Sequence, residues 1–360
     1  MNLSYFIVFV IPFFISFILT PLVKRIAFKV GAVDIPKDDR KIHKKPIARL
    51  GGLAIVVSVV FTIVVNIFFG KYTSWEFRVD RNTLGVLAGC FIVVIIGIID
   101  DIKPQKAKMK LFFQILAALC IVFLSDIRVR AISNPFSESG VLELNYYFSC
   151  LVSICWLIGV TNAINLIDGL DGLAAGVSAL SCIAMFFVSM ILKDIDTEMI
   201  TIILAGAIMG FLPYNFNPAK IFMGDTGSTF LGFTLGVISI SGTLKAYTTI
   251  SIIIPLLILG LPLFDTTFTI LRRICTGRPV MEADRGHIHH KLIDMGFSQR
   301  QAVLLMYFAS AVLGVSAVWI TQIGQLSMLM TIVIVTVLML MLSKFIADIL
   351  RVRNYRKGDK

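Results

Sequence analysis

The sequence predicts an all-α fold, a polytopic integral membrane protein with about eleven transmembrane helices. The first observation is composition: 57% of the 360 residues are hydrophobic, only 15% are charged, and the mean hydropathy is +0.90. A soluble core cannot absorb that much apolar surface. The second is that the apolar residues form continuous runs, whereas the strands of a membrane β-barrel alternate apolar and polar residues. The third is that lysine and arginine gather between alternate runs, as expected for helices that cross back and forth.

The apolar runs have roughly the 20-residue length that a helix needs to cross a bilayer. They cover residues 3–26, 50–69, 82–100, 110–125, 146–164, 171–191, 199–214, 227–243, 249–271, 301–321 and 326–350. The first run lacks both a basic leading segment and a cleavage site, so we expect an uncleaved span rather than a signal peptide. Because no internal repeat is evident, we expect a single transmembrane domain over residues 1–360.

The basic residues predict an N-terminus outside the cell and a C-terminus in the cytoplasm. In this arrangement 26 of the 33 Lys and Arg residues lie inside and seven lie outside, which is the bias described by the positive-inside rule. The predicted cytoplasmic segments are the loops 27–49, 101–109, 165–170, 215–226 and 272–300 and the basic tail 351–360. Orientation therefore accounts for the net charge of +11 better than nucleic-acid binding does. Attraction to anionic lipid or to a phosphorylated substrate is a second role for this charge.

The cysteines and histidines do not form a zinc pattern. None of the six cysteines forms a Cys-x-x-Cys pair, so we expect the cysteines to pack as small, buried hydrophobic side chains. Three of the four histidines lie at 287–290, whereas helical zinc sites usually place histidines four residues apart. We expect His287, His289 and His290, together with Arg285, to contact phosphate or sugar, with a solvated loop as the alternative.

A pair of carboxylates, Asp100 and Asp101, ends the run 82–100. A helix C-terminus carries partial negative charge and disfavours carboxylates. The pair is therefore either a solvated helix end or a site for a cation or for proton transfer. Lys108 and Lys110 follow closely and could neutralise these acids or hold phosphate.

Asn165, Asp168 and Asp171 recur at every third residue and would share a face if they lay on one helix. Asp168 precedes a glycine, so a helix N-cap is the simpler interpretation of that residue. Capping does not explain Asn162 and Asn165 at membrane depth, where polar side chains are functional candidates.

Further polar groups follow the same pattern at other predicted helix ends. Asp225 lies between glycines, and is either an N-cap or an oxygen ligand for Mg²⁺ at a helix start suited to phosphate. Lys44 and Arg49 either reflect orientation or reach an anionic substrate. We expect Asp265, about two turns inside the run 249–271, to face the bundle interior near the same cavity.

The predicted orientation puts Asp100, Asp101, Asp168, Asp171 and Asp225 on one wall of a cytoplasmic cavity. Five carboxylates would repel an anionic substrate unless a cation lies between them. An Mg²⁺ ion that bridges to a pyrophosphate would both neutralise the carboxylates and bind the substrate. The membrane supplies the other reactant, a lipid whose head group meets the cavity from the side.

These motifs resemble the polyprenyl-phosphate N-acetylhexosamine-1-phosphate transferases, glycosyltransferase family 4, over about residues 1–321. The resemblance lies in Asp100-Asp101, in Asn-Leu-Ile-Asp-Gly-Leu-Asp-Gly at 165–172, in Phe-Met-Gly-Asp-Thr-Gly-Ser at 222–228 and in Asp-Arg-Gly-His-Ile-His-His at 284–290. All four occur in order on one predicted membrane side. The chain departs from the family at Pro104, where Asp or Lys is frequent, so a charged role there is in doubt.

The resemblance implies that undecaprenyl phosphate attacks the β-phosphorus of a UDP-N-acetylhexosamine, giving a sugar-diphospho-lipid and UMP with Mg²⁺, or alternatively Mn²⁺. It implies that Asp225 is a metal ligand and Asp100 the base, with Asp101 beside it in the catalytic pair. Asp168 is alternatively the nucleophile of a two-step reaction. The implied substrate contacts are Lys108, Lys110, His289 and His290 for phosphate and Asp171, Asn215 and Phe222 around uracil. We also expect Asn165, Arg285 and His287 to bind substrate. The further candidates, from their positions in the sequence, are Lys44, Arg49 and Asp265.

The histidine run also bears on the sugar, because the branch of the family that uses the muramyl-pentapeptide donor has three consecutive histidines. Here Ile288 interrupts the run, and a Pro-Leu-Phe-Asp segment lies upstream at 262–265. This resembles the branch that transfers from UDP-N-acetylglucosamine to start teichoic acid, O-antigen (lipopolysaccharide) or similar polymers. The expected location is the bacterial inner membrane with the active site on the cytoplasmic face, and a homodimer is left open.

Two other classes fit less well. Intramembrane prenyltransferases also use Mg²⁺ and aspartates, but in an Asn-x-x-x-Asp-x-x-x-Asp spacing that differs from Asn165, Asp168 and Asp171. A secondary transporter should show repeated halves and polar clusters in the middle of the bilayer. No repeat is evident here, and the polar clusters gather at one face of the membrane.

Overall fold

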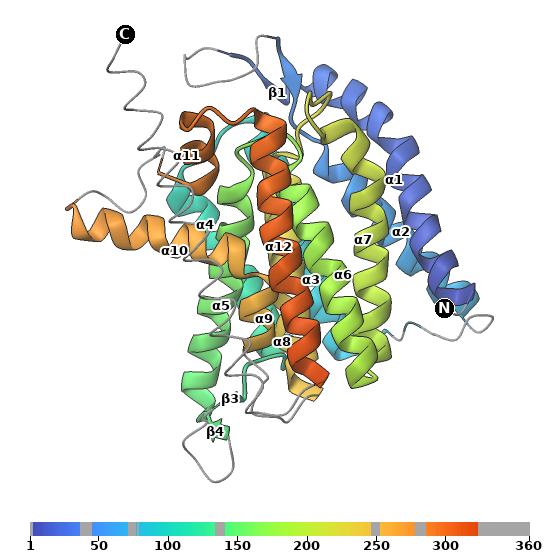
Figure 1. Cartoon of the computed structure of the whole chain (residues 1–360). Coiled ribbons are helices and arrows are strands. Elements are labelled where there is room, and N and C mark those ends of the chain that lie inside the picture. The colour runs from blue at the N-terminus through green and yellow to red at the C-terminus, as the bar shows by residue number, and fades with distance from the viewer. Residues whose placement is uncertain are drawn as a thin grey trace.

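The computed structural model describes residues 3–36, 45–70, 77, 79–133, 141–245, 253–277 and 286–322 (Figure 1). Its helices are α1 (Leu3–Val30), α2 (Gly52–Phe69), α3 (Arg81–Ile102), α4 (Ala107–Leu119) continued by the π-helical turn η2 (Cys120–Leu124), α5 (Tyr146–Ile167), α6 (Leu173–Leu192), α7 (Ile195–Asn215), α8 (Gly224–Lys245), α9 (Ile253–Ile258), α10 (Gly260–Cys275), α11 (Ile288–Asp294) and α12 (Gln299–Gln322). Two short antiparallel hairpins pair β1 (Val33–Asp34) with β2 (Ile47–Ala48), and β3 (Ala131–Ser133) with β4 (Val141–Glu143). The expected all-α class is confirmed.

Eight helices within the described residues are long and apolar enough to cross a membrane: α1, α2, α3, α4 with η2, α5, α6, α7 and α12. Each matches one of the predicted runs, so this is a multi-pass membrane protein. The predicted run 227–243 forms the 22-residue helix α8. The predicted run 326–350 and the tail 351–360 lie outside the described residues.

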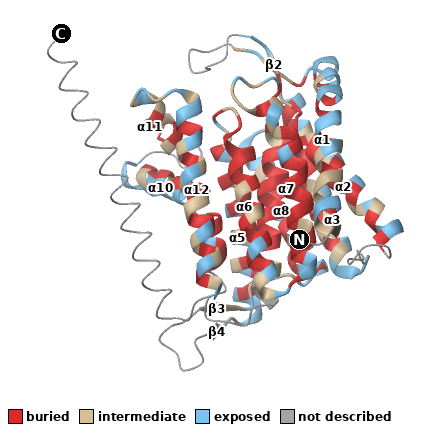
Figure 2. Cartoon of the chain, turned by 45° about the vertical axis from the view of Figure 1, so that its right-hand side comes forward, coloured by how far each residue is buried: buried red, intermediate tan, exposed pale blue. Residues whose placement is uncertain are grey.

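Helix α8 forms the centre of the bundle, and its middle turns are almost wholly buried (Figure 2). It packs against α3 and α5. Small residues permit this close approach, because a Cβ on Gly232 would press on the backbone of Thr161 in α5. A helix enclosed by protein needs fewer large apolar side chains than one that faces lipid, which explains the Gly- and Ser-rich sequence of α8.

The predicted run 249–271 is not one continuous span, which corrects that expectation. It is divided into α9 and α10, and α10 points away from the bundle axis in Figure 1. The physical reason is the two-faced sequence of α10. Its exposed face carries Phe264, Phe268 and Leu271, whereas its buried face carries polar groups that include Asp265 and Arg273.

Successive long helices run in alternate directions (Figure 1). The C-terminal ends of α3, α5 and α7 therefore meet the starts of α2, α6 and α8 at one end of the bundle, called here the site end. Helices extend further into the predicted loops than expected: Asn165 lies in the last turn of α5, and Asp225 lies in the first turn of α8. Side chains from distant parts of the chain are thereby fixed on helix termini.

Candidate active site

An acidic triad lies at the site end, where α3 stops and α8 starts. One carboxylate oxygen each from Asp100, Asp101 and Asp225 lie within 4.8 Å of one another. Asp100 and Asp101 are buried, and Asp225 is half-buried. Three carboxylates at this separation need positive charge or strong hydrogen-bond donors among them.

Asp101 receives its donors from the backbone of α8. Its carboxylate accepts from the N–H of Asp225 at 2.9 Å, from the N–H of Thr226 at 3.0 Å and from Thr226 Oγ1 at 2.7 Å. The first N–H groups of a helix have no partner inside the helix, and a carboxylate there also offsets the positive end of the helix dipole. Asp101 therefore caps α8 from the end of α3, and the N-cap alternative for Asp225 itself does not hold.

The backbone around Gly224 explains how the two helix ends approach so closely. Gly224 has φ +72°, and a Cβ there would overlap both Arg49 O and the Asp101 carboxylate. Any other residue would be strained in this conformation and would also lack room. The glycine before Asp225 is thus required by the contact between α8 and the acidic residues of α3.

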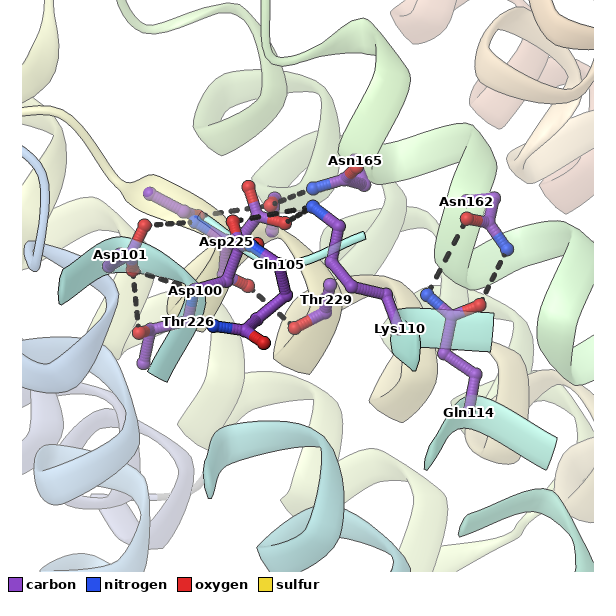
Figure 3. A network of polar contacts seen from close by, with 12 residues as sticks. Asp100, Asp101, Gln105, Lys110, Gln114, Asn162, Asn165, Asp225, Thr226 and Thr229 are labelled. Atoms are coloured by element: carbon purple, nitrogen blue, oxygen red, sulfur yellow. Dashed lines mark hydrogen bonds and ion pairs between the residues drawn. The ribbon is translucent and has the colours of Figure 1, made fainter. Parts of the chain in front are cut away.

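Lys110, on the first turn of α4, supplies the positive charge. Its Nζ donates to Asp225 Oδ2 and, at 3.3 Å, to Asp100 Oδ2 (Figure 3). Asp100 Oδ1 accepts the N–H of Gln105 at 2.7 Å. Arg49 lies on the other side, with Nη2 at 3.7 Å from Asp101 and 3.9 Å from Asp225. Lys110 and Arg49 therefore bracket the triad.

The position of Arg49 follows from backbone pairing. The N–H of Phe222 donates to Ala48 O at 2.8 Å, and the N–H of Gly51 donates to Phe222 O at 3.0 Å. This places the segment between β2 and α2 against the segment that precedes α8. Phe222 itself is half-buried.

The donor set fits a hard divalent cation. Carboxylate oxygens are the ligands that Mg²⁺ prefers, and Asp100 and Asp225 already share one cation, the Lys110 ammonium. The Asp101 oxygens are engaged by three donors from α8, so Asp225 and Asp100 are the better ligands and Asp101 supports them.

Two polar contacts extend this network into the bundle. Asn165 Nδ2 donates to Ser228 Oγ of α8 at 2.8 Å. Asn162 and Gln114 form a side-chain pair, with Asn162 Nδ2 donating to Gln114 Oε1 at 2.8 Å (Figure 3). The amides noticed at membrane depth therefore connect α5 to α8 and α4.

Asp168 and Asp171 do not share a helix with Asn165, which corrects the one-face expectation. Asp168 is the C-cap residue of α5, and Asp171 lies in the turn before α6. Burial, and then the charges of Asp225 and Asp101, raise the pKa of Asp168 to about 7. Asp171 Oδ2 accepts from Asn217 Nδ2 at 2.9 Å and from the N–H of Ala219 at 3.0 Å.

Asn215 ends α7 close to this turn. Its Nδ2 donates to Ile221 O at 3.0 Å, while its buried Oδ1 has no partner among the described residues. A buried amide oxygen without a donor is costly in a protein interior, which makes Asn215 Oδ1 a candidate acceptor for a substrate N–H.

The histidine segment also reaches the site end. The imidazole of His289 is buried, and a Cβ on Gly169 would overlap it. Burial, together with the neighbouring His290, lowers the pKa of His289 to about 3, so the ring is neutral. His287 contacts Asp265, which faces inward from α10 as expected.

Three predicted site residues are not brought into this network. Lys108 is exposed on α4. Lys44 and Arg285 lie outside the described residues.

Sequence reasoning missed several supporting residues, namely Gln105, Gln114, Asn217, Thr226 and Tyr307. The OH of Tyr307 in α12 donates to Gly172 O at 2.6 Å and thereby stabilises the turn after Asp171. Gln114 carried a usable signal, because it is an amide within a predicted span, four residues after Lys110. The other contacts depend on tertiary structure and have no local signal.

The chain is similar in sequence to known proteins. Residues 83–243 match the model of glycosyl transferase family 4. The chain is 40% identical over 312 residues to a probable undecaprenyl-phosphate N-acetylglucosaminyl 1-phosphate transferase of Bacillus subtilis, covering 87% of this chain and 84% of that protein. It is 31% identical over 349 residues to a decaprenyl-phosphate N-acetylglucosaminephosphotransferase of Mycolicibacterium smegmatis, covering 91% and 85%. A phospho-N-acetylmuramoyl-pentapeptide-transferase of Staphylococcus haemolyticus is 30% identical over 339 residues, covering 88% and 98%.

Proposed function

This chain belongs to glycosyl transferase family 4, and we propose that it transfers N-acetylglucosamine 1-phosphate from UDP-N-acetylglucosamine to undecaprenyl phosphate. The products are UMP and a sugar-diphospho-lipid, the first lipid-linked sugar of an envelope polymer such as teichoic acid or O-antigen. The similarity of 40% to a relative named for this activity supports the choice of donor and acceptor. The site end then faces the cytoplasm, as the distribution of basic residues predicts.

The observation that carries the proposal is the acidic triad bracketed by two cations. Phosphoryl transfer needs positioning and electrostatic stabilisation more than covalent chemistry from the protein. The carboxylates of Asp100 and Asp225 suit a divalent metal, and Lys110 and Arg49 lie beside them to meet further phosphate oxygens.

The metal, Mg²⁺ or alternatively Mn²⁺, would be held by Asp225 and Asp100 and would neutralise charge on the phosphate oxygens of the donor. The protein's own residues do the rest. Asp101 keeps the first turn of α8 in place through three hydrogen bonds. Asp100, which lies beside Lys110, is alternatively the base that takes the proton of the lipid phosphate, in which case Asp225 holds the metal without it.

The part of the site around α6 is assigned to the nucleotide. Asp171, Asn215 and Phe222 surround the end of α7 and are proposed to hold the uracil, with the unpartnered Asn215 Oδ1 accepting from its imide N–H. Oδ2 of Asp171 already accepts hydrogen bonds from Asn217 and Ala219. Its Oδ1 is then the oxygen left for the ligand.

A direct attack by the lipid phosphate is favoured over a two-step route through Asp168. Without the metal, burial and the charges of Asp225 and Asp101 raise the pKa of Asp168 to about 7, and a protonated carboxyl is a poor nucleophile. Asp168 is better suited to donate a hydrogen bond to the diphosphate. The two-step route would show itself as a covalent phospho-enzyme after incubation with donor alone.

The second candidate donor is UDP-N-acetylmuramoyl-pentapeptide, because a relative named for that transfer is 30% identical. The test uses the purified full-length protein, undecaprenyl phosphate, Mg²⁺ and each donor in turn, with UMP release and labelled lipid as the readouts. The proposal expects turnover with UDP-N-acetylglucosamine and little with the pentapeptide donor. The reverse preference would assign the chain to the second activity.

A further inference from the structure

Asp265 lies on α10, and the roles proposed above do not use it. Its side chain is 2% exposed, and a carboxylate at such a position is costly unless it is well hydrogen-bonded. Its Oδ2 contacts His287 Nδ1 at 2.9 Å, and its Oδ1 accepts the N–H of Ile288 at 2.8 Å. Both partners belong to the segment that starts α11. One carboxylate therefore connects the helix that leaves the bundle to the histidine segment of the site.

The contact with Asp265 also decides which nitrogen of His287 carries a proton. An ionised carboxylate only accepts hydrogen bonds, so Nδ1 of His287 must be the donor. In the neutral ring Nε2 then carries a lone pair and can only accept. The side chain of His287 is 6% exposed, so solvent has little influence on this choice.

The ring of His287 stacks on that of His289, and the ring of His290 lies tilted by 44° against His289. The His287 and His289 rings are parallel within 10°, with centroids 5.6 Å apart, and the His289 and His290 centroids are 4.3 Å apart. His289 lies directly beside Gly169, the residue after Asp168. Both of its ring nitrogens are buried without a hydrogen-bond partner among the described residues. Buried polar atoms without a partner need an explanation, and a ligand that reaches these two nitrogens would supply one.

We propose that Asp265 is a positioning residue for the diphosphate side of the site. It holds His287 in the Nδ1–H form, and through the stacked rings it sets where His289 lies against the turn after α5. The inference rests on the proposed function only in naming the donor diphosphate as the group that these rings meet. Asp265 itself touches no substrate.

The first test reads the protonation of His287 without any turnover. The chain has only four histidines, so nitrogen-15 histidine spectra can be assigned with single substitutions. At a pH above the usual imidazole pKa, the wild type is expected to hold His287 in the Nδ1–H form. In Asp265→Asn the new amide can donate a hydrogen bond to Nδ1, so His287 is expected to lose that form. An unchanged His287 signal in Asp265→Asn would overturn the inference.

The second test is a kinetic double-mutant cycle. Asp265→Asn is expected to raise the KM for UDP-N-acetylglucosamine about 10- to 100-fold, the range found when a carboxylate that orients a metal-bound histidine is lost, with a smaller change in kcat. Since Asp265 acts through His287, adding Asp265→Asn to His287→Gln should cost little more. Fully additive losses would contradict the proposal.

Asp194→Asn is the matched control. Asp194 is also buried, accepts from Thr197 Oγ1 at 2.6 Å, and lies at the start of α7, at the opposite end of the bundle. It should lower thermal stability without raising KM, and an equal rise in KM would mean that the effect of Asp265 is general destabilisation. Absence of UMP release from the wild type would refute the proposed function, and the histidine spectra would still decide the role of Asp265.

Discussion

Oδ1 of Asp101 accepts the backbone N–H of Asp225 at 2.9 Å, although 124 residues separate the two in the chain. The last turn of α3 thus caps the first turn of α8, and the helices that carry the acidic triad are fixed to each other. Asp100 points to Lys110 while its neighbour Asp101 points to the backbone of α8. Two adjacent aspartates therefore have different tasks, and substitutions should separate them.

Asp101→Ala should mainly lower stability. It leaves the first N–H groups of α8 without their acceptor, and each buried unsatisfied group costs about 1–3 kcal/mol. Thermal unfolding in detergent should show a clear fall in Tm. Asp100→Asn is the paired variant: it keeps the size of the side chain, and it should lose turnover with little change in Tm. Equal Tm values for Asp101→Ala and the wild type would contradict the capping role.

Asp225→Asn should abolish the response to Mg²⁺. A metal that binds only the folded protein stabilises it by about 2.7 kcal/mol at a concentration of 100 times Kd. The wild type should therefore gain Tm with added Mg²⁺ and the variant should not, and turnover should be lost in parallel. A variant that still gains Tm and turns over at low Mg²⁺ would remove Asp225 from the metal site.

Lys110→Met should lower kcat by about 100-fold, a typical loss when one group that stabilises phosphoryl charge is removed. Lys108→Met is the matched control, because Lys108 lies on the same helix turn but is exposed. Steady-state rates of both variants at saturating substrates make the comparison. Similar losses of kcat in the two variants would mean that both lysines only attract an anionic substrate, and would contradict a specific role for Lys110 at the triad.

The sequence predicted the class of fold and the end of the bundle at which polar residues gather. Apolar runs and the basic residues between them are visible in the sequence itself, so the membrane spans and their alternating directions could be predicted from it. The different roles of Asp100 and Asp101 could not be predicted from the sequence, because they depend on the packing of α8 against α3. The break between α9 and α10 was missed for a similar reason: the apolar run looked long enough, and only the inward-facing Asp265 hinted that one face needed protein contacts.

The raised pKa of Asp168 predicts a pH-dependent stability. Between the ordinary aspartate pKa of about 4 and about 7, the folded state keeps a proton that the unfolded state has released. The free energy of unfolding should therefore fall as pH rises through this window. With a chelator present, Tm of the wild type should decline more steeply than that of Asp168→Asn. Parallel curves would show that Asp168 ionises normally.

In the proposed reaction the phosphorus next to the sugar moves to the lipid. The direct measurement uses UDP-N-acetylglucosamine labelled separately at the α- and β-phosphorus, with undecaprenyl phosphate and Mg²⁺. We expect the β-label in the lipid product and the α-label in UMP, and we expect Asp225→Asn to form neither product. Release of UDP, with no phosphorus label in the lipid, would instead mean that the sugar alone is transferred, which would contradict phosphoryl transfer.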